Sequence, residues 1–353
     1  KTLTPRQFDE IMQAFTRRTE SIALAEGGSV FVLPQPDGST HYLRLRVAND
    51  HDLLAGVLED VTLSMTERLR VEHERDYDML TGLYNRRAFQ VRCHALFQTP
   101  EVLHYAAFVM MDLDNLKRIN DTFGHDLGDR YIQLAGHSLH ESLPEKSLCS
   151  RLSGDEFLIL LYGFDTPEER SSCLTGLHAT IQSYSAALPN GGTMRISMSA
   201  GVARYPEDAG DPELLRKYAD FAMYQVKHSH KGDMSLFRPD AFAQAAHADL
   251  LQREFMQLLQ EGRVVYHFQP LFSVTDGHAA AYEALMRTTM PNLRSPADVM
   301  KLAQKTGMLY EVEHLTFFRA SEAFVRLQEE GLIAPDAKLF INSISSVCLN
   351  DAD

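Results

Sequence analysis

Apolar and polar positions alternate most clearly in the middle of the chain. An apolar run at 105–111 ends at Asp112 and predicts a buried strand. Apolar stripes with helical spacing then alternate with further strand-like runs. In chain order the predicted elements are a strand at 105–111, a helix through Ile132, Ala135 and Leu139, strands at 148–152 and 157–162, a helix through Leu174, Leu177, Ile181 and Tyr184, a strand at 194–203 and a helix at 212–227. This β-α-β-β-α-β order predicts a ferredoxin-like α+β domain over residues 79–238.

Two different patterns precede this domain. Residues 1–62 have a helix-like start and then strand-like runs at 29–33, 41–47 and 54–61, with a Pro-Asp-Gly turn at 36–38. Residues 63–78 are polar and favour a helix, with a weak apolar stripe at Val61, Met65 and Leu69. This segment is either a solvated connector helix or one helix of a dimeric coiled coil.

Strands and helices alternate again from residue 245 to residue 353. Strand-like runs at 264–268, 279–285 and 338–342 are separated by helical patterns, which is typical of an α/β barrel. Three strands cannot close an eight-stranded barrel, so we expect an incomplete TIM-type segment. Because the sequence starts at Lys1 rather than Met and stops at Asp353 within a pattern, we expect it to be part of a longer protein.

The composition narrows the kinds of partner that the chain can bind. A formal net charge of -14 argues against a nucleic-acid groove, whereas local cations and a metal still allow a small phosphorylated ligand. The four cysteines form no CxxC pair, which favours a reducing compartment over disulfides or a zinc site. No apolar run approaches the roughly 20 residues that span a bilayer. We therefore expect a cytoplasmic chain without membrane contact, although a membrane region could precede it in the intact protein.

Acidic residues gather at strand ends in the predicted middle domain. Asp112 ends the first buried strand and Asp114 lies two residues on, so both point the same way in an extended backbone. Asp155 and Glu156 lie at the tip of the predicted hairpin, which can lie beside the first strand. Two carboxylates ~4 Å apart repel by roughly 4 kcal/mol at an effective dielectric of 20, so a proton, a cationic side chain or a metal must offset the charge. Such oxygen ligands suit Mg²⁺; the simpler alternative is a set of solvated turn residues.

Five motifs across residues 76–237 resemble the GGDEF family of diguanylate cyclases. They are DxLTGLxNR at 78–86, DLDNLKRINDTFGHDLGD at 112–129, RLSGDEF at 151–157, SAGVA at 199–203 and ADFAMYQVK at 219–227. The resemblance implies that the domain condenses two GTP into cyclic di-GMP and releases two pyrophosphates. It also implies two Mg²⁺ or Mn²⁺ ions in each active site. A homodimer is implied as well, because each domain holds one GTP and two domains must meet face to face.

The resemblance further implies roles for particular residues. Asp155, Glu156 and Lys117 would be catalytic. Asp112 and Asp155 would bind the metal ions with the backbone carbonyl of Leu113, and Glu156 would support that site. The substrate-binding residues that the family implies are Asn120 and Asp129 at the guanine edge, Gly154 in the turn, and Lys117, Lys227 and Lys231 at the phosphates.

Three departures from the family pattern bear on activity. Ser153 replaces the first glycine of the signature turn; a type II turn requires φ > 0 only at Gly154, whereas a type I′ turn requires it at Ser153 as well. Lys231 stands where the family usually has arginine, and it keeps the charge without the bidentate fork. Pro144-Glu145-Lys146-Ser147 occupies the place of the family's RxxD product-inhibition motif, so we expect no feedback through such a site.

The last segment carries a second resemblance. Phe268-Gln269-Pro270, AAAYEALMR at 279–287 and Asn342 resemble the opening of an EAL cyclic di-GMP phosphodiesterase. The family implies that Glu283 and Asn342 bind metal and that Arg287 contacts a product phosphate. Because the family's later acidic motifs and catalytic lysine would lie beyond the end of this sequence, we expect an incomplete EAL segment over residues 245–353 without phosphodiesterase activity.

The first segment carries a weaker resemblance. GVLEDVT at 56–62 resembles the end of a PAS sensor domain, so residues 1–62 are interpreted as a partial PAS-like segment. The alternative is a non-sensory strand pair that packs on the cyclase.

Three hypotheses for the function of the chain follow. The first is an active diguanylate cyclase in a sensor-regulated bifunctional protein. The second is a GTP-binding regulatory domain that turns over poorly and controls the adjoining EAL phosphodiesterase; Ser153 and Lys231 favour it. The third is a pure interaction module, which would be expected to have lost a metal carboxylate such as Asp112 or Asp155, and both are present.

Overall fold

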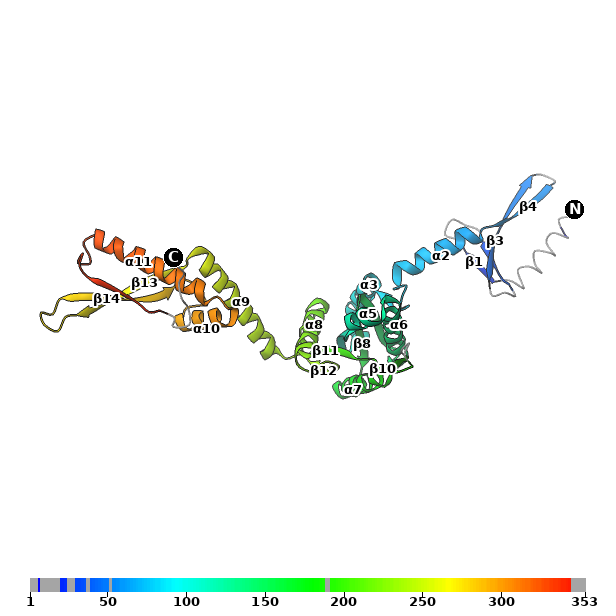
Figure 1. Ribbon diagram of the computed structural model, residues 1–353. Coiled ribbons are helices and arrows are strands. Elements are labelled where there is room, and N and C mark those ends of the chain that lie inside the picture. Colours follow the sequence, from blue (N-terminus) through cyan, green and yellow to red (C-terminus); the bar gives the residue numbers. More distant parts are fainter. Residues whose placement is uncertain are drawn as a thin grey trace. The chain divides into compact units, whose positions relative to one another are not determined.

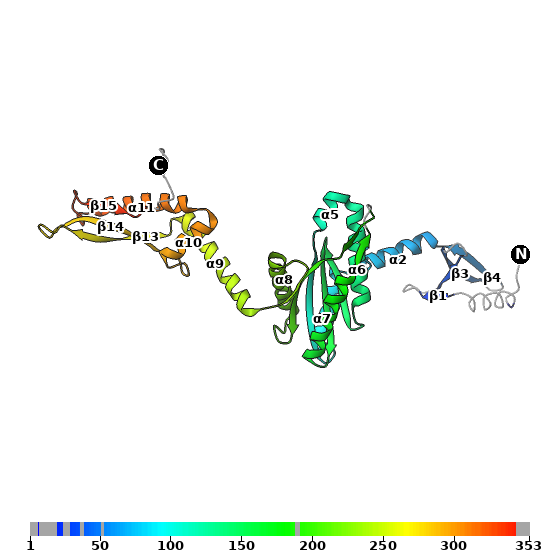
Figure 2. The same cartoon turned by 60° about the horizontal axis from the view of Figure 1, so that its bottom comes forward.

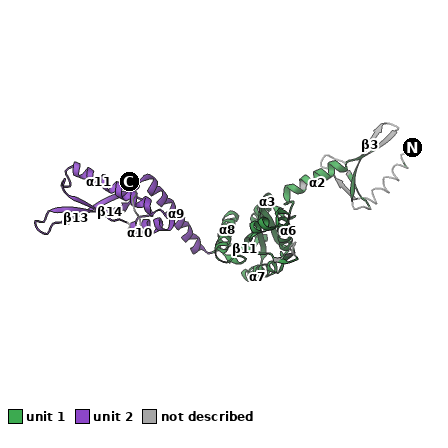
Figure 3. Ribbon diagram, viewed as in Figure 1, with its two compact units in different colours: residues 1–237 green, residues 238–353 purple. Residues whose placement is uncertain are grey.

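The computed structural model describes residue 6 and residues 20–23, 29–35, 39–50, 53–187 and 191–343. Figure 1 shows its helices and strands, and Figure 3 shows the two compact units into which the chain divides, residues 1–237 and residues 238–353. Each unit has an apolar core of its own. Among the described helices, none combines the length and the apolar character that crossing a bilayer requires.

The first unit begins with an antiparallel sheet of strand order β1-β2-β3-β4. Its strands are β1 (Glu20–Ala23), β2 (Ser29–Pro34), β3 (Thr40–Asp50) and β4 (Leu53–Asp60). The three predicted strands are confirmed as β2, β3 and β4, and β1 is a further strand that the pattern did not predict. The predicted helix-like start, apart from residue 6, and the predicted turn at 36–38 lie outside the described residues.

Helix α2 (Thr62–Asp76) follows this sheet at the position of the predicted connector. Two positions of the predicted stripe, Val61 and Met65, are buried and pack on Val30 of β2. The third position, Leu69, is 36% exposed. The start of the stripe thus packs on the N-terminal sheet of the same chain.

One side chain, Asn85, joins the end of α2 to the start of α3 (Arg86–Phe97). Its Oδ1 accepts a hydrogen bond from the backbone N–H of Ala88 at 2.9 Å, as an N-cap residue does. Its Nδ2 donates to the carbonyl oxygens of Glu74 and Arg75 at 3.1 and 2.9 Å. The same amide therefore satisfies an N–H at the start of one helix and two carbonyls at the end of the other.

The middle domain, residues 77–237, is the part of Figure 2 that carries the labels α5, α6, α7 and α8. It is built on a mixed sheet with strand order β12-β11-β6-β8-β7-β5. Its strands are β5 (Tyr84–Asn85), β6 (Tyr105–Leu113), β7 (Ser147–Ser153), β8 (Glu156–Phe164), β11 (Met198–Tyr205) and β12 (Met234–Leu236). Its helices, besides α3, are α4 (Pro100–Leu103), α5 (Leu116–Phe123), α6 (His125–Ser142), α7 (Pro167–Ser183) and α8 (Pro212–Ser229). β6 lies between β11 and β8 and is antiparallel to both. The predicted α+β class is confirmed.

Helices cover both faces of this sheet, because alternate residues of its strands point in opposite directions. On one face the strands pack on α6 and α7 through Val109, Met111, Ile159, Leu161, Ala135, Leu139, Leu174 and Leu177. On the other face Phe108 contacts Phe89 of α3, with ring centroids 6.4 Å apart. α8 packs so closely on β11 that a Cβ at Gly201 would lie 2.1 Å from the carbonyl oxygen of Ala219. With helices on both faces, the ends of the strands are among the places left open to a ligand.

The prediction of one continuous strand at 194–203 is wrong. β10 (Thr193–Arg195) pairs with β9 (Ser185–Ala187) in a separate small sheet, and β11 starts only at Met198. Between them, the N–H of Ser197 donates to the hydroxyl of Tyr131 at 3.1 Å. The carbonyl of Ser197 accepts from the N–H of Asp114 at 2.8 Å. These contacts break the strand although the apolar pattern continues through it.

The second unit consists of a three-stranded sheet and helices on it. Its elements are α9 (Pro239–Glu261), β13 (Val264–Phe272), β14 (Ala279–Thr288), α10 (Pro296–Thr306), α11 (Leu309–Glu329) and β15 (Lys338–Ile341). The three predicted strands are confirmed. β13 and β14 are antiparallel, whereas β14 and β15 are parallel. The predicted TIM-type barrel, which is parallel throughout, is therefore not confirmed among the described residues.

Candidate functional site

A cavity of about 430 Å³ lies where β6 ends, between the β7–β8 turn, the start of α5 and the end of α8. It is lined by Asp112, Leu113, Asp114, Asn115, Leu116, Lys117, Arg118, Asp121, Asp155, Lys227 and Lys231. Six of the predicted site residues are in this set. Arg118 and Asp121 were not predicted, although they lie in the same sequence motif as Lys117.

Asp112 is the most buried acid of the predicted metal site. It is the last residue but one of β6, and it is only 4% exposed. The Nζ of Lys227, from the end of α8, lies 2.6 Å from its Oδ2. Burial raises the pKa of Asp112 to about 6, the Lys227 hydrogen bond acts against this rise, and the Asp155 carboxylate adds to it. Of the three ways to offset the charge, the structure thus shows a cationic side chain.

Asp155 reaches the same cavity because the β7–β8 hairpin lies beside β6. In this pairing Asp112 lies opposite Glu156. The N–H of Leu113 donates to the carbonyl oxygen of Asp155 at 2.9 Å. The expected meeting of Asp112 and Asp155 is therefore seen in the fold.

The turn between β7 and β8 accommodates serine without strain. Gly154 has φ +36°, whereas Ser153 is not among the non-glycine residues with positive φ in the described part of the chain. Ser153 therefore does not have the positive φ that a type I′ turn would require of it. Its hydroxyl donates to Oε2 of Glu156 at 2.8 Å, a hydrogen bond that a glycine at this position could not make.

Arg151 binds the β7–β8 turn through its side chain, a role that the sequence analysis did not predict. Its Nε and one terminal nitrogen donate to the carbonyl oxygen of Gly154 at 2.9 and 2.8 Å. The other terminal nitrogen lies 3.2 Å from both carboxylate oxygens of Asp78. Asp78 in turn accepts from the N–H and the hydroxyl of Thr81 at 2.9 and 2.8 Å. Both residues stand in recognised motifs, but their pairing depends on a contact between segments more than 70 residues apart.

Asp114 is fixed by hydroxyl groups. Its two carboxylate oxygens accept from Ser197 at 2.7 Å and from Ser199 at 2.8 Å, and the residue is 2% exposed. Its lone pairs are partly used by these donors. It is therefore better placed to hold β11 against the end of β6 than to bind a ligand directly.

The residues predicted for guanine lie on α5 and α6, outside the residues that line the cavity. Asn120 is half-buried and Asp129 is exposed. The Oδ1 of Asn120 is buried without a hydrogen-bond partner among the described residues. Gly128 allows this position, since a Cβ there would lie 1.8 Å from that oxygen. The structure thus leaves one acceptor of Asn120 unsatisfied beside Asp129.

The acid groups of the cavity suit a cation that needs few protein ligands. Among the described residues no group of three or more His, Cys, Asp or Glu side chains is gathered to hold a metal ion. Mg²⁺ is usually bound by one or two carboxylates together with water and substrate phosphates. Asp112 and Asp155 meet that need, and Leu113 lines the same cavity. The donor set therefore fits Mg²⁺ or Mn²⁺ better than zinc.

The EAL-like residues also come together, in the second unit. The Nδ2 of Asn342 donates to Oε1 of Glu283 at 2.8 Å. Arg287 and Asn342 line a cavity of about 240 Å³ with Glu313. Arg287 donates to the carbonyl oxygen of Met286 at 2.9 Å.

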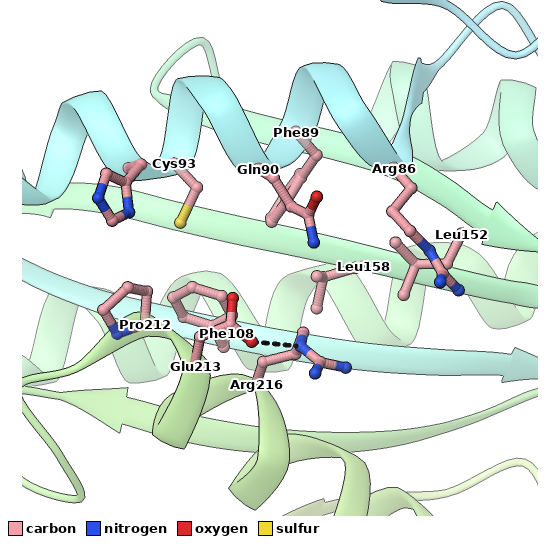
Figure 4. Close-up of a pocket in the computed structure, with 11 residues that line it drawn as sticks. Arg86, Phe89, Gln90, Cys93, Phe108, Leu152, Leu158, Pro212, Glu213 and Arg216 are labelled. Carbon is pink, nitrogen blue, oxygen red and sulfur yellow. Dashed lines mark hydrogen bonds and ion pairs between the residues drawn. The ribbon is translucent and has the colours of Figure 1, made fainter.

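A third hollow, of about 100 Å³, lies between α3 and α8 (Figure 4). Phe108 and Leu158 of the sheet form its floor, and Arg86 and Arg216 extend over it from the two helices. None of the predicted site residues lines it.

Two family profiles match the chain. The profile described as "Diguanylate cyclase, GGDEF domain" matches residues 75–233, and the EAL domain profile matches residues 224–353. The match to the GGDEF profile includes the turn, Asp112 and the lysines described above.

Two curated relatives are similar to most of this chain. The chain is 30% identical over 275 residues to the signaling protein YkoW of Bacillus subtilis, which covers 76% of this chain and 34% of that protein. It is 29% identical over 239 residues to MucR of Pseudomonas aeruginosa, named a bifunctional diguanylate cyclase/cyclic di-GMP phosphodiesterase, covering 67% of this chain and 34% of that protein. The chain thus spans about a third of the length of these relatives. A solved structure of TpbB or YfiN from Pseudomonas aeruginosa, comprising only the GGDEF domain, is 32% identical, covers 46% of this chain and 94% of that one, and has a TM-score of 0.43.

Proposed function

Because the chain contains a GGDEF domain followed by an EAL domain, a combination that belongs to cyclic di-GMP signalling, we propose that its middle domain is a diguanylate cyclase. It condenses two GTP into cyclic di-GMP and releases two pyrophosphates. Two relatives are named for activities of this kind: MucR as a bifunctional diguanylate cyclase/cyclic di-GMP phosphodiesterase, and NbdA of Pseudomonas aeruginosa as a cyclic di-GMP phosphodiesterase.

One observation carries the proposal. Asp112 and Asp155 share a cavity with Lys117, Lys227 and Lys231. Carboxylates suit divalent cations, and several ammonium groups around them suit the charge of a triphosphate. A site that gathers both kinds of group is what phosphoryl transfer requires, since the protein mainly positions the reactants and offsets their charge.

In the proposed reaction, the side chains of this domain orient GTP. Lys117, Lys227 and Lys231 bind phosphate oxygens, and Asn120 and Asp129 bind the guanine edge by hydrogen bonds. The carbonyl of Leu113, Asp112 and Asp155 would hold two Mg²⁺ or Mn²⁺ ions, with Glu156 in support. Bound metal would lower the pKa of the attacking 3′-hydroxyl and neutralise phosphate charge.

The bonds exchanged require two copies of the domain. The 3′-oxygen of one GTP forms a bond to the α-phosphorus of the other, the bond from that phosphorus to pyrophosphate breaks, and the hydroxyl proton leaves to solvent or to a nearby carboxylate. The reciprocal attack by the second 3′-hydroxyl on the first α-phosphorus closes the ring and releases the second pyrophosphate and the second proton. Each domain holds one GTP, so a homodimer brings the two nucleotides face to face.

A second function is supported by the Ser153 hydroxyl. Its hydrogen bond to Glu156 ties up an oxygen of the residue that is proposed to support the metal site. This favours a domain that binds GTP but turns over slowly and regulates the adjoining EAL phosphodiesterase. The two proposals differ in turnover and agree on GTP binding.

The flanking segments complete the proposal. We infer that the N-terminal strands form part of a PAS-like sensor, and that residues from β13 onward form part of a TIM-type EAL domain. The hydrogen-bonded pair Glu283 and Asn342, with Arg287, would be the beginning of its metal and phosphate site. The absence of phosphodiesterase activity from this chain remains a prediction. With a formal net charge of -14, we propose neither nucleic acid nor membrane as a partner.

The decisive experiment is incubation of the purified chain with GTP and Mg²⁺ or Mn²⁺, followed by chromatography of the products. Cyclic di-GMP and pyrophosphate support the cyclase, and tight GTP binding without turnover supports the regulatory domain. Asp155→Ala should abolish turnover, whereas Asp165→Ala, at the exposed far end of β8, should not. Incubation with cyclic di-GMP tests the phosphodiesterase prediction, and hydrolysis would overturn it.

A further inference from the structure

The loop after α8 carries Lys231, one of the lysines in the proposed GTP cavity. α8 ends at Ser229, and the N–H of His230 still bonds to the carbonyl oxygen of Val226 at 3.0 Å. The backbone before Lys231 is therefore anchored to the helix. The contacts of the backbone that follows Lys231 then determine where its ammonium group can reach.

Gly232, the next residue, is hydrogen-bonded through both its N–H and its carbonyl. The N–H donates to the buried hydroxyl of Ser199 at 3.2 Å. The carbonyl oxygen accepts from Nε2 of Gln182, on α7, at 2.9 Å. Nε2 of His178, one helical turn earlier, lies 3.2 Å from the same oxygen. Two elements, β11 and α7, thus hold the two peptide units on either side of the Gly232 Cα.

The hydrogen bonds on the N–H side continue to the proposed catalytic strand. The hydroxyl of Ser199 donates to Oδ1 of Asp114 while it accepts from Gly232. Ser197 donates to the other oxygen of Asp114 at 2.7 Å. Asp114 follows Asp112 by two residues, so the chain of bonds connects the Lys231 loop to the end of β6.

The backbone at this point also requires glycine. Gly232 has φ +80°, and a Cβ there would lie 2.8 Å from the hydroxyl oxygen of Ser197. Any other residue would strain the loop or push Ser197 from Asp114. The loop therefore has one backbone path, which is set on both sides of Lys231.

We propose that Gln182 and His178 of α7, with Gly232, are positioning residues that fix the backbone beside Lys231 and thereby aim its ammonium group at the phosphates of GTP. This inference rests on the proposed function, because it assumes that GTP occupies the cavity. Lysine lacks the rigid fork of arginine and loses much side-chain freedom when it is held in one place. A fixed backbone lowers the entropy that the lysine side chain loses on binding. The hydrogen bonds to Gly232 therefore compensate for the absence of an arginine fork at this position.

Gln182 and His178 can both be accommodated at the carbonyl of Gly232 in either tautomer of the histidine. If Nε2 of His178 carries the proton, it donates to the carbonyl of Gly232 beside Gln182. If it does not, Gln182 can donate one N–H to Gly232 and the other to His178, whose Nε2 lies 3.1 Å away. Gln182 is a donor to Gly232 in both cases, so it is the residue to change.

The test is a double-mutant cycle of Gln182→Met and Lys231→Ala in the full chain, with the dissociation constant for GTP in Mg²⁺ as the measurement. Methionine keeps the length of glutamine without the donor. Gln182 is exposed, so the variant should keep its fold, which a thermal melt checks. We expect Gln182→Met to weaken GTP binding by about threefold to tenfold, the range for one lost hydrogen bond. In the Lys231→Ala background the same change should have almost no effect.

Thr180→Ala is the matched control. Its hydroxyl bonds only to the carbonyl of Gly176 within α7, so GTP binding should stay the same. Equal effects of Gln182→Met with and without Lys231 would overturn the positioning role, as would no effect in either background or an unchanged affinity in Lys231→Ala alone. A chain that does not bind GTP at all would overturn the proposed function and this inference together. GTP binding without turnover leaves the cycle measurable, so failure of catalysis is distinguished from failure of the positioning.

Discussion

The acid groups at the candidate sites of the two units have different kinds of partner. In the middle domain, Asp112 and Asp155 share a cavity with several cationic side chains, and burial and mutual repulsion hold the pKa of Asp112 at about 6. In the second unit, Glu283 accepts from the amide of Asn342 at 2.8 Å and Glu313 accepts from the hydroxyl of Ser343 at 2.7 Å. Neutral donors satisfy these two carboxylates.

This difference indicates where a ligand is needed. A neutral donor occupies a lone pair but leaves the charge of the carboxylate, and such a pair can exist without a ligand. Two carboxylates beside lysines form an arrangement whose charges can be redistributed when a polyanion and metal enter. The first cavity is therefore the one whose function is expected to fail when a single charge is removed.

The largest expected effect is on Asp112. Asp112→Asn removes the charge that faces Asp155 and Lys227 and should lower the rate of cyclic di-GMP formation by about a hundredfold or more, because one preorganised electrostatic group contributes at least that much. Pyrophosphate release gives the rate. Asp165→Asn is the control, with a side chain that is 82% exposed at the other end of β8. A rate within twofold of the unmodified chain would remove Asp112 from the site.

The next largest effect is expected on stability, from the contacts of Arg151 with the β7–β8 turn. Arg151→Ala removes the bonds to Gly154 and to Asp78, and we expect it to lower the free energy of unfolding by about 2 kcal/mol, as for hydrogen bonds to a charged group. Urea denaturation of the chain measures this. Arg118→Ala, in the cavity but without such bonds among the described contacts, serves as the comparison. Equal stability of the two variants would show that the turn holds its shape without Arg151.

Ser153→Gly should sharpen the choice between an active cyclase and a slow regulatory domain. It frees Glu156 from the hydroxyl at 2.8 Å, and we expect turnover to rise by roughly threefold to tenfold, the effect of one hydrogen bond. The initial rate at saturating GTP is the measurement, and Ser171→Gly on the exposed side of α7 is the control. An unchanged rate would mean that Ser153 does not restrain Glu156.

A smaller effect is expected in the dependence of stability on pH without metal. The ordinary pKa of an aspartate is 3.8, and that of Asp112 is about 6 in the folded chain. Between these values the folded state binds more protons than the unfolded state, so Asp112 makes the chain less stable as the pH rises from about 4 to about 6. Melting temperatures in a chelating buffer should therefore fall less over this range in Asp112→Asn than in the unmodified chain. Parallel curves would contradict the raised pKa.

The smallest effect should come from the second unit. Glu283→Gln keeps an acceptor for Asn342 and removes a charge that no described carboxylate opposes, so stability should change by about 1 kcal/mol or less. Denaturation of the unit in the full chain measures it. A loss as large as that of Arg151→Ala would show that the two cavities are less different than their contacts indicate.

Much of the fold and of the first cavity could be predicted from the sequence because the signals are local. The apolar run that ends at Asp112 and the Ser153-Gly154 turn each predict an element, and the ferredoxin-like order of elements allows the hairpin to lie beside the first strand. The meeting of Asp112 and Asp155 follows from those patterns together with that order. The motifs add the lysines, since Lys117 and Lys227 stand at fixed places within them.

The rest depends on contacts between segments that no local pattern connects. The bonds of Ser197 to Tyr131 and to Asp114 break a strand that the apolar pattern continues. The pairing of Arg151 with Asp78 joins positions 73 residues apart. Gln182 acts on Gly232 across 50 residues. Such pairs can be identified only from the tertiary structure, because the sequence around one partner does not indicate which residue the other partner is.

The amide of Asn85, which closes α2 and opens α3, has a mechanical consequence. Because one side chain is bonded to both helix ends, the junction has little freedom to act as a loose hinge. We expect a rotation of α2 about its axis to be transmitted to α3, which packs on the sheet that carries the turn. A movement of the N-terminal sheet would then be coupled to the middle domain, and a substitution at Asn85 would weaken that coupling.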